Sequence, residues 1–189
     1  MQPTSEHRPS PVPGETVLST WPNTKFFLST TETSTWASLA AFHGVGTLRL
    51  TTCRLLFTVT PPSSSRAHLS IPLAWLRPEK LHIRRPFFDN KHISGLLTPC
   101  ELHTPDPIFR FSKSMEFRLE LLDVQVYDTL FFALRDLIAD PQRLALHTRA
   151  LRAQVDEKLV PTGNHFAFVD PTDPRYLHLA TQMMHPTLP

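Results

Sequence analysis

The chain of 189 residues has few glycines and cysteines, and this scarcity excludes several classes of site. Its five glycines form no phosphate-binding loop, and the lone Gly44-Val45-Gly46 leads into a strand pattern, whereas a dinucleotide site opens a helix. The two cysteines, Cys53 and Cys100, form no CxxC pair, so we expect neither a disulfide scaffold nor a cysteine zinc site. We therefore expect a reduced, intracellular protein of the cytoplasm or nucleus.

Signatures of catalysis, metal binding and membrane spanning are also missing. None of the ten histidines stands four residues from another. The chain has no GxSxG motif, no P-loop and no carboxylate pair suited to acid–base chemistry. No apolar run approaches the roughly 20 residues of a membrane span, and the N-terminus lacks the apolar core of a signal peptide. We predict no catalytic residue, no metal and no cofactor.

Composition divides the chain into four parts. Nineteen prolines punctuate it, and those at positions 3, 9, 11 and 13 predict a flexible leader over residues 1–13. Residues 14–140 carry the regular patterns of one domain. Residues 141–159 predict an additional helix, because Asp140-Pro141 is a favourable helix start. Residues 160–189 predict an irregular tail, in which the apolar residues from Tyr176 to Met183 also fit a short helix.

Seven short strands are predicted within the domain, near residues 24–30, 46–51, 54–60, 67–73, 80–84, 91–98 and 115–121. Each alternates apolar and polar residues, which is typical of antiparallel strands with one buried face. In residues 54–60 this pattern turns Leu55, Phe57 and Val59 inward and Arg54 outward. Residues 31–43 predict a long connection with a helical turn, and Gly95 predicts a bulge or a close backbone approach.

The period then changes from two to about 3.6 residues. Apolar residues at positions 127, 130, 131, 134, 137 and 138 predict a helix over about 124–139, capped by Asp123. Strands followed by a helix indicate an α+β fold. We predict a seven-stranded antiparallel β-barrel or sandwich that is capped by this C-terminal helix, with the extra helix after it.

Two motifs carry a resemblance to a known family. Residues 46–57 (GTLRLTTCRLLF) resemble the strand–turn–strand signature of GRAM domains, which belong to the pleckstrin-homology superfold. Ile71-Pro-Leu and residues 85–95 (RPFFDNKHISG) resemble the WW-domain-binding-protein-2 family, and Pro13-Gly14-Glu15 is similar to its fungal members. The likeness spans roughly residues 13–139. It implies a GRAM/pleckstrin-homology-like domain in which Asn90 and Gly95 shape a turn.

The resemblance also implies a function. Members of the family are adaptors, described as transcriptional coactivators, whose Pro-Pro-x-Tyr tails bind WW domains. This chain has no Pro-Pro-x-Tyr; its nearest match is a degenerate motif with Pro174 and Tyr176, which holds one proline where two are expected. Because WW binding depends on a preformed polyproline II segment, we expect protein partners, and Pro174 and Tyr176 are at most a weak, degenerate ligand for a WW domain.

An anionic partner is the alternative. The first hundred residues hold ten Lys and Arg against five Asp and Glu, and the excess is strongest between Arg49 and Lys91. This stretch predicts either a solvated wall or a surface for weak, salt-sensitive lipid binding. Pleckstrin-homology domains that bind phosphoinositides usually carry Lys or Arg in the loop between their first two strands, but here that loop has none. The basic residues also lack a helix that could read a nucleic-acid groove. The candidate surface comprises Arg49, Arg54, Lys80, His82, Arg84, Arg85 and Lys91.

We therefore expect a non-catalytic adaptor, with a peripheral membrane-binding module as the alternative.

Overall fold

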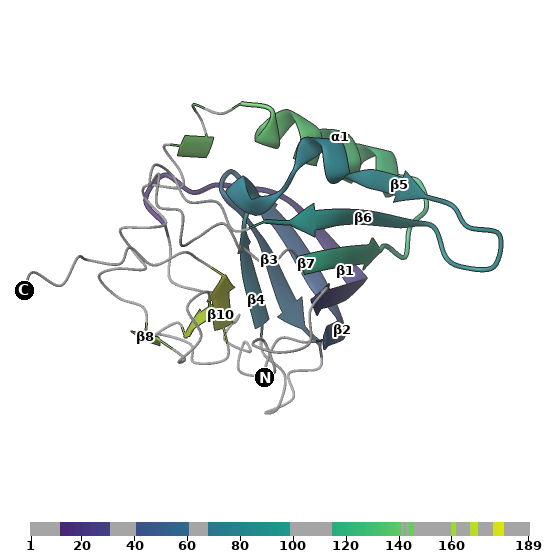
Figure 1. Cartoon of the computed structure of the whole chain (residues 1–189), viewed down its shortest axis with the longest axis horizontal. Helices are drawn as coiled ribbons and strands as arrows, with labels where there is room; N and C mark the ends of the chain where they lie inside the picture. Colours follow the sequence, from purple (N-terminus) through teal and green to yellow (C-terminus); the bar gives the residue numbers. More distant parts are fainter. Residues whose placement is uncertain are drawn as a thin grey trace, which may run out of the picture.

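The computed structural model describes residues 12–30, 41–60, 68–98, 115–140, 142, 144 and 145, and the backbone of 160–161, 167–169 and 176–179. Strands dominate, and one α-helix of 13 residues follows the seventh strand (Figure 1). The elements are β1 (Val17–Thr30), β2 (Ala41–Thr51), β3 (Arg54–Val59), β4 (His68–Pro72), η1 (Leu73–Trp75), η2 (Pro78–Lys80), β5 (His82–Arg84), β6 (His92–Leu97), β7 (Met115–Glu120), α1 (Val126–Ile138), β8 (Val160–Pro161), β9 (Ala167–Val169) and β10 (Tyr176–Leu179).

The fold is α+β, as predicted. Strands β1 to β7 form an antiparallel sheet in the order β5-β6-β7-β1-β2-β3-β4, and β10, β9 and β8 extend it beyond β4. The long strand β1 pairs with β2 over most of its length and with β7 over residues 25–30, so it joins the two halves of the sheet.

The prediction of a closed barrel or a two-sheet sandwich was wrong, because the strands form one curled, open sheet (Figure 1). The edge of β4 takes the parallel strand β10 as its partner and not β5. The two ends of the sheet come together only just after β4, where the chain contacts the end of β6. There Leu76 forms an isolated bridge with Leu97, and Thr98 N donates to Trp75 O at 2.8 Å.

A bulge lets β1 serve both halves of the sheet. Trp21 pairs with Leu48 and Thr24 with Gly46, so β1 carries one extra residue across this interval. Asn23 there has φ of 54°, and an asparagine tolerates this left-handed conformation better than most residues do. Gly46 is needed for a different reason: a Cβ there would lie 2.0 Å from Thr58 O of β3.

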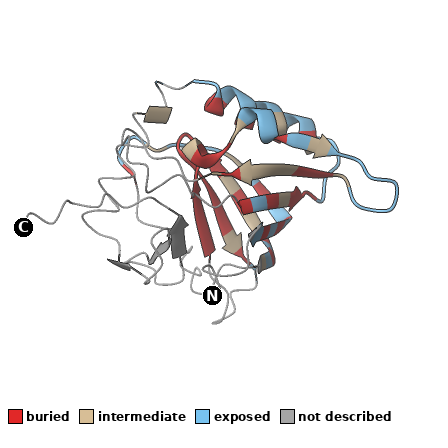
Figure 2. Ribbon diagram, viewed as in Figure 1, coloured by how far each residue is buried: buried red, intermediate tan, exposed pale blue. Residues whose placement is uncertain are grey.

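The core lies between the concave face of the sheet and α1. The predicted helical stripe is confirmed, because Tyr127, Leu130, Leu134, Leu137 and Ile138 are all buried in one cluster with the sheet. Figure 2 shows this division, with buried residues along the strands and exposed ones on the outer side of the helix. The helix begins at Val126, later than predicted, since Asp123 Oδ1 accepts from Gln125 N and caps the turn before it.

The N-terminal boundary differs from the prediction. Residues 1–11 of the predicted 1–13 leader lie outside the described residues, but Val12 is buried against Cys53. Two hydrogen bonds tie residue 16 to the β2–β3 turn: Thr52 N donates to Thr16 O at 3.0 Å, and Thr16 N donates to Thr52 Oγ1 at 3.3 Å. Residues 12–16 therefore cover the outer side of this turn.

Three further segments differ from their predictions. Residues 41–43 belong to β2, not to the predicted connection, and residues 31–40 lie outside the described part. The predicted tail, 160–189, contributes β8, β9 and β10, because residues 176–179 complete the hydrogen-bonding edge of β4. Of the predicted helix at 141–159, the structure describes three helical residues, and Asp140 Oδ1 accepts from Gln142 N as the predicted cap would. The remainder lies outside the description.

Candidate binding surface

The seven predicted basic residues do not form one surface. Arg54 corrects the prediction most clearly, because its side chain is only 1% exposed. Its Nε donates to Glu15 Oε1 and its Nη2 to Glu15 Oε2, both at 2.7 Å, and Nη1 donates to Ser70 Oγ at 3.3 Å. The outward face of β3 is buried here because residues 12–16 cross it. Arg54 is thus a structural residue.

The ion pair changes the acidity of its carboxylate. Burial alone would raise the pKa of Glu15, but the hydrogen bonds and charge of Arg54 outweigh it and lower the pKa below 4.5. Cys53 Sγ also donates to Glu15 Oε1, at 3.3 Å. Burial, followed by the charge of Glu15, raises the pKa of this thiol to about 12, so Cys53 is not a reactive thiolate.

Two more predicted residues are engaged elsewhere. Arg49 is half-buried on β2, opposite Leu56 of β3, and lies in the other half of the sheet from β5. Lys91 Nζ lies 3.7 Å from Asp128 Oδ1 and 4.8 Å from the centre of the Tyr127 ring. Lys91 therefore holds the start of α1 against the sheet.

The other four, Lys80, His82, Arg84 and Arg85, are exposed and follow one another around β5. Their side chains make no hydrogen bond or ion pair with any described residue. Lys80, His82 and Arg84 line a groove of about 690 Å³ on the outer face of β5, β6, β7 and β1. Of the seven predicted residues, three therefore line one groove, Arg85 lies beside them, and Arg49, Arg54 and Lys91 lie elsewhere.

Strand register explains how the groove is built. His82 of β5 pairs with Ser94 of β6, Ser94 with Arg118 of β7, and Arg118 with Phe27 of β1, so one row of side chains crosses four strands. The guanidinium of Arg118 lies 5.6 Å from the centre of the Phe27 ring. The full lining is Phe27, Ser29, Lys80, His82, Arg84, His92, Ser94, Gly95, Leu96, Glu116, Phe117 and Arg118.

Gly95 lets strand β6 lie close to the side chain of Phe117 in the middle of this surface. It pairs with Phe117 without a register shift, so the predicted bulge is absent and the close approach is correct. A Cβ at position 95 would lie 2.5 Å from Cε1 of the buried Phe117 ring. The Phe117 ring, in turn, stacks on Phe26 at 6.4 Å in the core.

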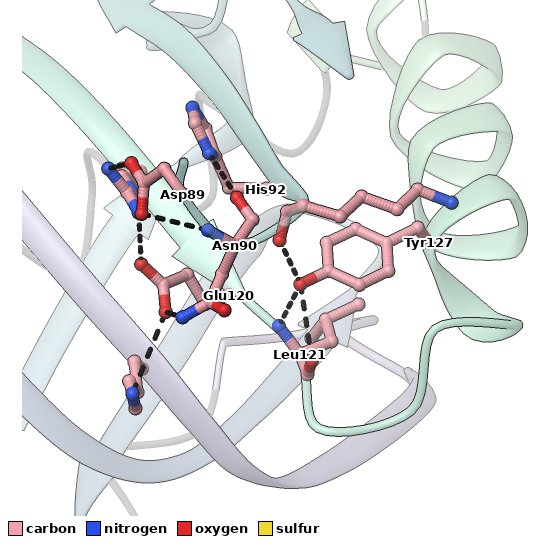
Figure 3. A network of polar contacts seen from close by, with 9 residues as sticks. Asp89, Asn90, His92, Glu120, Leu121 and Tyr127 are labelled. Atoms are coloured by element: carbon pink, nitrogen blue, oxygen red, sulfur yellow. Dashed lines mark hydrogen bonds and ion pairs between the residues drawn. The ribbon is translucent and has the colours of Figure 1, made fainter. Parts of the chain in front are cut away.

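A polar network braces the base of the β5–β6 loop (Figure 3). Arg118 donates to Asp89 at 2.6 Å and to Glu120 at 2.5 Å. Asn90 Nδ2 donates to Glu120 Oε2 at 3.1 Å, and Asn90 O lies 2.8 Å from His92 Nδ1. The hydrogen bond from Arg118 lowers the pKa of Asp89 to about 2, so this carboxylate stays ionised and paired.

Tyr127 links the same loop to the helix. Its hydroxyl accepts from Leu121 N at 2.7 Å and donates to Lys91 O (Figure 3). Burial raises the pKa of Tyr127, so the hydroxyl keeps the proton that it donates. Tyr127 thus fixes the end of the loop at Lys91, next to Asn90, which bonds to Glu120 as expected of a turn residue. Gly95, expected to shape the same turn, lies within β6 instead.

Beyond this base, the loop carries two phenylalanines at its tip. Phe87 is 101% exposed and Phe88 is 104% exposed, so neither contacts the rest of the domain. In the sequence both stand within the family-like motif of residues 85–95. The sequence feature that could have identified them is a pair of adjacent aromatic residues within a polar turn that contains a proline. Arg118, Phe27 and Glu15 were also missed, because their roles depend on partners far away in the sequence.

The remaining predicted site, Pro174 and Tyr176, is described only in part. Pro174 lies outside the described residues, and Tyr176 is the first residue of β10, where it pairs with His68 of β4. Within the described ranges, no group of three or more His, Cys, Asp and Glu side chains is placed to hold a metal. In the same ranges, no helix is long and apolar enough to cross a bilayer.

Comparisons with known proteins add little. No protein-family model matches the chain, and no curated protein matches it. The chain is similar to a chain in a solved structure described as the 8S snRNP assembly intermediate, with 18% identity and a TM-score of 0.42. That likeness covers 65% of this chain and 82% of the other. At this TM-score the likeness carries no inference about fold or function.

Proposed function

We propose that this protein is a non-catalytic adaptor on a GRAM/pleckstrin-homology-like scaffold, and that its basic groove receives an acidic segment of a protein partner. The observation that carries the proposal is the row of Lys80, His82 and Arg84 along the open groove. These side chains have no charged partner in the described part of the chain. Unpaired cations beside a cleft attract an anionic partner and orient it.

The scaffold supports this proposal. Seven antiparallel strands followed by one packed helix are the elements that the GRAM resemblance predicts, although the sheet is open. The motif glycines Gly46 and Gly95 both stand where a Cβ would collide with a neighbouring strand. The resemblance adds the expectation that the partners act in transcription.

The groove suits a peptide in both size and chemistry. Its volume of about 690 Å³ falls within the range of roughly 300–1,000 Å³ that is usual for ligand sites. Phe27, which is 37% exposed, and the half-buried Leu96 offer apolar contacts along the floor. Glu116 is the exposed acid in the lining, so a bound carboxylate faces cations along the β5 side and one anion along the β7 side.

Affinity purification with crosslinking tests the proposal. Full-length protein is captured from cells after treatment with a lysine-reactive crosslinker, and the crosslinked peptides are identified. We expect a specific protein whose crosslinks to Lys80 fall in an acidic segment. Lys80→Glu with Arg84→Glu removes that protein, because charge reversal repels the segment.

Arg135→Glu is the matched control, since it reverses an exposed arginine on α1 away from the groove lining. Capture that is equally strong in the groove variant and in the control would refute the role of the groove. Absence of any specific partner would refute the adaptor itself.

A further inference from the structure

An adaptor groove does not explain the tip of the β5–β6 loop. The loop extends away from the rest of the domain (Figure 1), and Phe87 and Phe88 at its tip are both fully exposed. Single exposed apolar residues are common on protein surfaces, but two adjacent aromatic rings on a projecting loop are a concentrated apolar surface. Such a surface favours a partner that can surround both rings.

The loop is held in place at its base, so its tip is presented in a defined direction. Asp89 and Asn90, directly after the phenylalanines, bond to Arg118 and Glu120 of β7. The backbone of Lys91 accepts from Tyr127 of α1. An apolar tip on a braced base enters an apolar layer with less ordering cost than a free segment does.

Positive charge is in excess at the base of the loop. Asp89 is paired with Arg118, so its charge is offset. Arg84 and Arg85 precede the tip, are exposed, and have no side-chain partner among the described residues. Cations directly behind an aromatic tip match a layer of anionic headgroups above an apolar interior.

A second exposed apolar surface lies beside this base. Leu122 and Val124, between β7 and α1, are 75% and 62% exposed. Lys91 Nζ donates to Val124 O at 3.4 Å, which places the two loops next to each other. Asp123 stands between these residues and is exposed, so a charged side chain interrupts this second apolar surface.

We propose that residues 84–91 form a membrane-insertion loop, in which Phe87 and Phe88 enter the apolar layer of an anionic bilayer and Arg84 and Arg85 bind its headgroups. A bilayer fits better than a protein pocket, because the tip presents two rings and little surrounding surface, whereas a stable protein interface buries roughly 800 Å² on each partner. Aromatic side chains also favour the membrane–water boundary.

The test uses full-length protein, vesicles of phosphatidylcholine with or without phosphatidylserine, and a phosphatidylserine monolayer whose surface pressure reports penetration. We expect binding to phosphatidylserine vesicles and a rise in monolayer pressure. Phe87→Ala with Phe88→Ala lowers the vesicle partition coefficient about tenfold and abolishes the pressure rise, because the apolar contribution is lost. Arg85→Gln lowers the partition coefficient about fivefold, as expected for one cation.

Phe132→Ala is the matched control, since it removes a 56% exposed phenylalanine from α1 and leaves the loop intact. All four positions are exposed, and an unchanged circular dichroism spectrum checks that the variants fold. The proposal is overturned if the wild type does not bind, or if the double variant raises the monolayer pressure as the wild type does. It is equally overturned if the double variant keeps vesicle binding and instead loses a protein partner.

Discussion

The buried pair of Glu15 and Arg54 makes a sharp stability prediction. The substitution Glu15→Gln keeps the shape of the side chain but removes its charge and one acceptor oxygen. Arg54 Nε or Nη2 then loses its partner at 2.7 Å, while the guanidinium remains 1% exposed. A buried cation without its anion cannot be compensated by water at that exposure.

The expected loss follows from the burial of the two groups. Removing one partner of a buried pair costs about 3–5 kcal/mol, whereas an exposed pair is worth about 0–1 kcal/mol. Glu15 is 10% exposed, and Ser70 still accepts from Arg54, so we expect the low end, about 3 kcal/mol. For a chain of this size that lowers the Tm by about 6–12 °C.

Urea unfolding of the full-length chain measures the effect, and Asp128→Asn provides the matched control. Asp128 is 58% exposed and lies 3.7 Å from Lys91, so its loss should cost less than about 1 kcal/mol. In a double-mutant cycle, Arg54→Met with Glu15→Leu should cost far less than the sum of the single changes. If Glu15→Gln proves as mild as Asp128→Asn, the pair is not buried in solution and the reasoning fails.

The pH dependence of stability gives a second measurement on the same pair. The pKa of Glu15 is lowered in the folded state, so the folded protein binds fewer protons than the unfolded chain. The stabilisation is therefore complete above pH 4.5 and is lost as the pH falls through the lower, folded pKa. The stability difference between wild type and Glu15→Gln should shrink below pH 4.5; a constant difference would contradict this.

Three further predictions concern the floor and the base of the candidate surface. Gly95→Ala should cost about 1–3 kcal/mol in urea unfolding, because its Cβ would lie 2.5 Å from the packed Phe117 ring; unchanged stability would show that the ring can move. Tyr127→Phe should cost about 1–3 kcal/mol, since Leu121 N and Lys91 O both lose their partner; a loss below the error of the measurement would mean that water replaces the hydroxyl. Asp89 should titrate near pH 2 by carboxyl NMR, because Arg118 favours its ionised form, and a midpoint near 3.8 would contradict the pairing.

Local pattern predicted the elements well. The alternation in residues 54–60 and the helical stripe from Tyr127 to Ile138 each correspond to an observed element within a few residues. These patterns reflect which side of one segment is buried, and that information is local. The open sheet could not be predicted in the same way, because closure depends on which strand takes the free edge of β4. That strand, β10, lies more than a hundred residues further along the chain.

The site was harder to predict, for a related reason. Alternation placed Arg54 outward, and it does point away from the core, but residues 12–16 cover that side. The alternation of apolar and polar residues within one strand cannot show that another segment covers its outer face. Lys80, His82 and Arg84 are exposed, as alternation predicted, because they lie at the end of the sheet, where no segment of the described chain covers them.

The distribution of cations makes the two proposals separable by salt. Of the seven basic residues, Arg54 and Lys91 are ion-paired and Arg49 lies in the other half of the sheet, so four remain around β5. Groove binding depends on charge, and the Debye length falls to about 3 Å at 1 M salt, so capture of an acidic segment should disappear there. Insertion of Phe87 and Phe88 has an apolar component that salt does not screen.

Membrane binding should therefore weaken as salt is added. A part of the binding that depends on the phenylalanines should persist at high salt. The measurement is vesicle partition against salt concentration for the wild type and for Phe87→Ala with Phe88→Ala. We expect the two curves to stay about tenfold apart at every salt concentration, because the aromatic contribution adds to the electrostatic one. Curves that converge at high salt would mean that the phenylalanines act only by positioning Arg84 and Arg85, and that they do not enter the apolar layer.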